Sequence, residues 1–84
     1  MEEMPVDRQL LLDTIASNVR RLRMERKWSQ DDLAVKCGVS RITINRIEMG
    51  RCMPDPELLF SLADAFGVSV DVFRQVCKPS GIAV

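Results

Sequence analysis

Residues 29–50 constrain the fold of this chain more than any other stretch, because they contain two short amphipathic segments joined at a glycine. Each segment begins with a serine, Ser29 or Ser40, whose hydroxyl can accept a hydrogen bond from a free amide of a helix's first turn. Gly38 stands between them and supplies the left-handed residue that commonly ends a helix. The pattern predicts two helices joined by a tight turn, at about 30–37 and 41–49.

The second of these helices has two contrasting faces. Ile44 and Ile47 lie three residues apart and form an apolar face. The opposite face carries basic, amide and aliphatic side chains: Arg41, Ile42, Asn45 and Arg46. This combination is typical of a helix-turn-helix, in which the second helix enters the major groove of DNA.

The composition is that of one small globular domain. Its 84 residues are 46% hydrophobic and 29% charged, as in ordinary soluble proteins. No apolar run approaches the roughly 20 residues of a membrane span, and the acidic Glu2 and Glu3 are unlike the start of a secretory signal. We therefore expect a cytoplasmic protein that does not contact membranes.

The charges are unevenly distributed although their sum is zero. Residues 17–51 contain nine basic and four acidic residues, which leaves +5 in this segment and −5 in the rest of the chain. A basic surface on a neutral protein can still bind phosphates. For the first predicted helix, a solvated charged face explains the arginines equally well.

The residues argue against metal, cofactor and enzyme chemistry. The chain has no histidine, and its three cysteines contain no CxxC pair: Cys37, Cys52 and Cys77. A structural zinc site needs closely spaced thiolate or imidazole ligands. No nucleophile–base pair is visible either. The sequence predicts no metal, no cofactor and no catalytic residue.

Flanking segments complete a predicted all-α domain of five helices. A long first helix spans about 6–27, where apolar residues recur at three- and four-residue steps: Leu11, Leu12, Ile15, Val19 and Leu22. Asp55 and Pro56 begin a fourth helix that ends near Phe66, and a short fifth helix follows it. The chain is predicted to contain a disordered N-terminus, the helical domain and a tail, at 1–5, 6–76 and 77–84.

From Ile15 to Phe73 the chain resembles the phage repressor and Cro-like helix-turn-helix proteins, also called the XRE family. The matching positions are Ile15, Val19, Arg20, Arg23, Ser29, Gln30, Leu33, Ala34, Gly38, Val39, Ser40, Ile44, Ile47, Glu48, Gly50, Pro54, Leu58, Leu62, Ala63, Gly67, Val68, Ser69 and Val70. The resemblance implies a compact lambda-repressor-like fold. The chain departs from it at Lys27, where many relatives have glycine, and in residues 1–12, which lengthen the first helix.

The resemblance also implies roles for single residues. Gln30 matches a glutamine that binds a backbone phosphate and braces a side chain of the DNA-reading helix. Arg23 and Glu48 match an ion pair that ties the first helix to the end of the DNA-reading helix. Lys36 and Arg51 are further candidates for phosphate contacts, with simple solvation as the alternative.

Five residues fall on positions that face DNA in the relatives: Ser40, Arg41, Ile42, Asn45 and Arg46. Either arginine can donate two hydrogen bonds to guanine O6 and N7, and Ile42 can pack on a thymine methyl. Asn45 can read adenine or brace the backbone. Arg46 can also bind a phosphate instead of a base.

The expected function is sequence-specific transcription regulation, by a homodimer that binds double-stranded DNA at a palindromic operator. Short relatives of this kind include restriction–modification controllers. Candidates for the dimer interface are Val70, Phe73, Val76 and Ile82, although Val70 and Phe73 can instead complete the monomer core. Asp31 and Asp32 are candidates for contact with RNA polymerase, with solvation as the alternative. The competing function is a protein-interaction module derived from this fold that no longer binds DNA.

Overall fold

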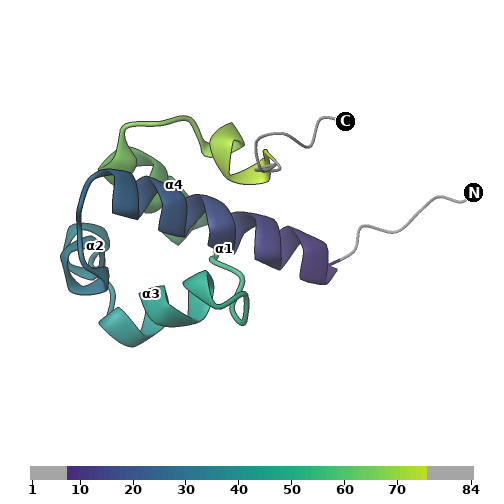
Figure 1. The fold of residues 1–84 in the computed structure, drawn as a ribbon, viewed down its shortest axis with the longest axis horizontal. Helices are drawn as coiled ribbons and strands as arrows, with labels where there is room; N and C mark the ends of the chain where they lie inside the picture. Colours follow the sequence, from purple (N-terminus) through teal and green to yellow (C-terminus); the bar gives the residue numbers. More distant parts are fainter. Residues whose placement is uncertain (1–7, 76–84) are drawn as a thin grey trace, which may run out of the picture.

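The structure, a computed structural model, describes residues 8–75, and every regular element in that range is a helix. Four α-helices and one short 3-10 helix follow one another along the chain: α1 Arg8–Glu25, α2 Gln30–Cys37, α3 Arg41–Glu48, α4 Pro56–Phe66 and η1 Val70–Arg74 (Figure 1). The predicted all-α class is confirmed. The fifth predicted helix is the 3-10 helix η1. The predictions for the N-terminus at 1–5 and the tail at 77–84 lie outside the described residues.

Helix α1 is the central element of the domain. In Figure 1 it runs along the long axis, with α2 and α3 on one side and η1 on the other. Every element contributes to one core, whose most deeply buried apolar residues are Val19, Leu33, Ile44, Ile47, Leu62 and Phe73. The helix-turn-helix formed by α2 and α3 is therefore held in place by tertiary packing, because helices of eight residues are marginal on their own.

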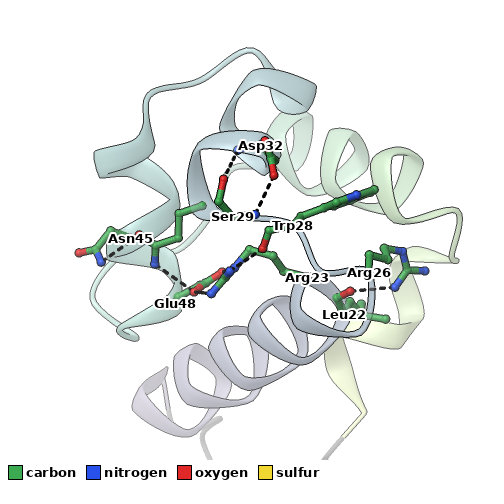
Figure 2. Close-up of polar contacts among 9 residues, drawn as sticks. Leu22, Arg23, Arg26, Trp28, Ser29, Asp32, Asn45 and Glu48 are labelled. Carbon is green, nitrogen blue, oxygen red and sulfur yellow. Dashed lines mark hydrogen bonds and ion pairs between the residues drawn. The ribbon is translucent and has the colours of Figure 1, made fainter.

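The start of α2 is fixed by a complete capping box. The Asp32 amide donates to Ser29 Oγ at 2.9 Å, and the Ser29 amide donates to Asp32 Oδ2 at 2.9 Å (Figure 2). The hydrogen bond from the Ser29 backbone lowers the pKa of the Asp32 carboxyl below its ordinary value. At the other end Gly38 adopts φ 71°, as the sequence predicts for the residue that ends this helix.

Helix α1 ends two residues earlier than the predicted end at Lys27. The cause is the conformation of Lys27, which has φ 60° and so lies in the left-handed region that favours glycine. A lysine in this conformation costs about 1 kcal/mol of backbone strain. The sharp turn brings Trp28 back against α1, where its amide donates to the Arg23 carbonyl at 3.1 Å.

An aromatic stack closes the junction between α1, α2 and α4. The indole of Trp28 stacks on Phe66 with ring centroids 5.7 Å apart. The Arg26 guanidinium donates to the carbonyl of Leu22 at 2.9 Å and to that of Phe66 at 2.6 Å. Figure 2 shows the first of these contacts. Arg26 thus places its positive charge at the C-terminal ends of both α1 and α4, where helix dipoles favour cations.

Candidate nucleic-acid interface

Helix α3 presents one polar face to the surrounding solvent. Its buried face consists of Ile44, Ile47 and Glu48, which pack towards α1 and α2. The exposed face carries the four residues that the sequence places there: Arg41, Ile42, Asn45 and Arg46. The side chain of Ile42 is 60% exposed, so an aliphatic group lies in the open between hydrogen-bond donors. Thymine methyls and guanine edges require this combination of contacts.

Arg23 and Glu48 fix the end of α3 to α1. Arg23 Nε donates to Glu48 Oε2 at 2.6 Å and Nη2 donates to Oε1 at 3.0 Å, which makes the pair bidentate (Figure 2). The third nitrogen, Nη1, donates to the Trp28 carbonyl at 2.8 Å. The Glu48 side chain is only 4% exposed, and its hydrogen bond raises the pKa of Arg23 above the ordinary arginine value. One guanidinium group of α1 therefore binds both the end of α3 and the backbone of Trp28.

Gln30 extends this contact to the exposed face of α3. Its Nε2 donates to Glu48 Oε1 at 3.1 Å, and its Oε1 accepts from Asn45 Nδ2 at 3.4 Å. The result is a continuous chain of side chains, Arg23–Glu48–Gln30–Asn45, which we call the bracing chain. Figure 2 labels three of its members, Arg23, Glu48 and Asn45. Asn45 therefore contacts the Gln30 side chain, which differs from the backbone contact that the sequence offered as the alternative to reading adenine.

The start of α3 has its own set of contacts. Ser40 Oγ accepts from the Thr43 amide at 3.2 Å and lies 3.0 Å from Thr43 Oγ1, so its hydroxyl caps the helix. Arg41 Nε lies 3.7 Å from Asp31 Oδ1, and both side chains are well exposed. A surface pair of this kind is worth about 0–1 kcal/mol, so Arg41 can leave it at low cost. The partner of Arg41 in this pair, Asp31, is one of the two residues that the sequence offered as a candidate for contact with RNA polymerase.

The three predicted phosphate-binding residues do not lie together. Gln30 adjoins α3 through Asn45, and Arg51 follows the end of α3, with its amide donating to the Arg46 carbonyl at 2.9 Å. Lys36 does not adjoin α3 in this way. Its Nζ lies over the Trp28 ring, 4.6 Å from the ring centroid. Lys36 is five residues after Asp31, which puts it roughly 140° around α2 from the side that faces Arg41. The structure therefore groups Gln30 and Arg51 with α3 and leaves Lys36 apart.

The predicted dimer residues are also separated. Phe73 is only 1% exposed and packs against Phe66, with ring centroids 6.3 Å apart. Of the two roles that the sequence left open for Phe73, the structure shows the one in the monomer core, which its ring fills. Val70 is half-buried, and Val76 and Ile82 lie outside the described residues.

Sequence reasoning missed Asn18, a fully buried polar residue of α1. Its Nδ2 donates to the Phe73 carbonyl at 3.1 Å and to the Gln75 carbonyl at 2.9 Å, and its Oδ1 accepts from Arg21 Nη2 at 3.3 Å. These bonds hold the end of η1 against α1. The available signal was a single amide within the apolar stripe of the first helix, where only a satisfied polar group is tolerated.

The described residues offer little for metal or thiol chemistry. Among residues 8–75, no three His, Cys, Asp or Glu side chains lie close enough together to hold a metal ion. Burial raises the pKa of the Cys37 thiol, which disfavours the reactive thiolate. Within the same range, every helix is too short or too polar to cross a membrane.

Comparison with known proteins identifies a family for this arrangement. A family model described as helix-turn-helix, HTH_3, matches residues 19–73. An uncharacterized HTH-type transcriptional regulator of Methanocaldococcus jannaschii is 50% identical over 46 residues, which are 54% of this chain and 70% of that protein.

Solved structures show the same fold. The crystal structure of a hypothetical transcription factor from Neisseria superimposes with a TM-score of 0.76 and 30% identity, covering 90% of this chain and 86% of that one. The restriction-modification controller protein C.AhdI from Aeromonas hydrophila superimposes with a TM-score of 0.71 over 74% of this chain and 94% of that one. At 24% identity, the second likeness shows a common fold alone.

Proposed function

The chain belongs to the helix-turn-helix family, and from this membership we propose that it is a transcription regulator that binds double-stranded DNA through α3. The observation that carries the proposal is the exposed face of α3, which combines arginine, asparagine and isoleucine and is braced from behind by a buried ion pair. A face held this rigidly can read base edges, because direct readout requires hydrogen-bond donors in fixed positions. The named relatives are regulators by description, which agrees with this function.

In the proposed complex α3 lies in the major groove. Arg41 and Ile42 contact base edges, Arg46 contacts a base or a phosphate, and Asn45 is held by Gln30 beside them. Gln30 and Arg51 bind the phosphates on either side of the groove. One helix of this length reads only a few base pairs, so we propose that two copies bind a palindromic operator whose half-sites lie about 10 base pairs apart. Val70, Val76 and Ile82 are the proposed contacts between the copies.

Selection of bound duplexes from a random pool tests the proposal as a whole. We expect enrichment of a two-fold symmetric sequence, with half-sites about one helical turn apart. Binding of the selected duplex should weaken steeply with salt, because each neutralised phosphate releases counterions. A pool without enrichment, together with binding that salt does not affect, would show that the chain is not a DNA-reading regulator and would favour the protein-interaction alternative.

Replacing Arg41 with alanine should remove a base contact. We expect a loss of about 1–3 kcal/mol in binding free energy to the selected duplex, and a relaxed preference at one base pair. Fluorescence anisotropy against the selected duplex and its single-base variants measures both effects. Arg74→Ala is the matched control, since it removes the same charge from η1, on the other side of α1 from α3. An equal loss on every duplex would reassign Arg41 to a phosphate.

A further inference from the structure

The first part of α1 contacts the loop that follows α3, although it lies outside the family match. The family model begins at residue 19, whereas α1 begins at Arg8. Gln9 Nε2 donates to the carbonyl of Gly50 at 3.3 Å and to Asp13 Oδ1 at 2.9 Å. Gln9 and Asp13, which both precede the family match, are therefore joined to each other, and Gln9 is joined to the loop after α3.

Gly50 is packed so closely on α1 that a larger residue would displace the Asp13 side chain. It is buried and has φ 72°, and a Cβ added to it would lie 2.7 Å from Asp13 Oδ1. Gly38 and Gly67 have almost the same φ, yet an added Cβ at either would meet nothing within 4 Å. A substitution at position 50 therefore meets two obstacles, a left-handed backbone and the Asp13 carboxylate, which would have to move aside.

The same loop closes the last turn of α3. The Gly50 amide donates to the Ile47 carbonyl at 3.1 Å, and the Arg51 amide donates to the Arg46 carbonyl at 2.9 Å. These bonds satisfy carbonyls that a helix end leaves without partners. The backbone of Arg51 is therefore placed by its bond to α3 and by the contact of its neighbour Gly50 with α1.

We propose that Gln9 and Asp13 are positioning residues that clamp Gly50 and thereby hold Arg51 in the place where it binds a DNA phosphate. The inference rests on the proposed function, and it assigns a role to the part of α1 that precedes the family match. Gln9 supplies the hydrogen bond to the loop. The Asp13 carboxylate accepts a hydrogen bond from the Gln9 amide, which orients it, and it also packs against Gly50. Neither side chain needs to touch DNA itself.

A double-mutant cycle on the full chain tests whether Gln9 acts through Arg51. Gln9→Ala changes no charge, and we expect it to weaken binding to the selected duplex about fivefold, the fold-change of one hydrogen bond. It should also reduce the slope of log binding constant against log salt concentration by up to about one unit, because one phosphate contact is impaired. In an Arg51→Ala background the same substitution should have no further effect. Ser17→Ala, at an exposed site on the same helix, should bind as the unaltered chain does.

Two results would overturn the clamp. Gln9→Ala could bind with unchanged affinity and slope, or its loss could multiply with that of Arg51→Ala, which would mean that the two residues act independently. Both results overturn the clamp only if the unaltered chain binds the selected duplex. Failure of the unaltered chain to bind any duplex would instead contradict the proposed function.

A second experiment tests the packing of Gly50 on Asp13 without DNA. Gly50→Ala should lower the melting temperature more than Gly67→Ala, because both add backbone strain but only the first meets a neighbour. In an Asp13→Ala background, the shift caused by Gly50→Ala should shrink to that of Gly67→Ala. Equal shifts for the two glycines in the unaltered background would show that Asp13 does not confine the loop.

Discussion

Replacing Glu48 with alanine is expected to lower the free energy of unfolding by about 3–5 kcal/mol, the usual consequence of removing one partner of a buried ion pair. The Glu48 side chain is 4% exposed and that of Arg23 is 14% exposed, so the guanidinium would be left with little access to water. Gln30 would also lose an acceptor for its amide. Urea denaturation followed by circular dichroism measures the change.

The matched variants separate the charge of Glu48 from its hydrogen bonds. Glu48→Gln keeps an oxygen that can accept from Arg23, so we expect a smaller loss than for alanine. The double variant Arg23→Ala, Glu48→Ala should lose less than the sum of the single variants, because it leaves no unpaired charge in the interior. Additive losses, or a loss below about 1 kcal/mol for Glu48→Ala, would mean that the pair behaves as a solvent-exposed one.

Replacing Phe73 with alanine is expected to cost about 3–5 kcal/mol of stability, as large-to-small substitutions of buried aromatic residues do. The ring is 1% exposed and contacts Phe66 within the monomer core. The loss should therefore be the same at every protein concentration. Thermal melts over a hundredfold range of concentration measure it.

Phe60→Ala is the matched control for Phe73, because it is the same substitution at a ring that is 60% exposed on α4. We expect a change of at most about 0.5 kcal/mol, the usual range for surface positions. A loss at Phe73 that grew as the protein was diluted would contradict the core assignment and return this residue to the interface between copies.

Local features of the fold could be predicted from the sequence because they depend on neighbouring residues. The start of α2 at Ser29 and the left-handed glycine at its end follow from capping chemistry. Phe73 could not be assigned in the same way. A short amphipathic segment buries its apolar face against either its own domain or a second copy, and the sequence pattern is identical in both cases.

Contacts between residues far apart in the sequence could be predicted only in part. The pairing of Arg23 with Glu48 was predicted by resemblance to a family, because no local pattern connects residues 25 positions apart. The contact of Gln9 with Gly50 joins residues 41 positions apart, and no resemblance covered it. Lys36 was grouped with the phosphate contacts by charge alone, whereas its direction on α2 depends on where Trp28 packs.

The bracing chain has a consequence for how base preference could be transferred from one protein to another. Asn45 is held by Gln30, which is held by Glu48, which is held by Arg23 on α1. In the proposed complex with DNA, the set of bases that α3 accepts is therefore determined partly by residues that do not touch a base. Grafting the surface of α3 onto a relative would transfer the side chains without their alignment. A faithful transplant of specificity has to carry Arg23, Gln30 and Glu48 with it as one unit.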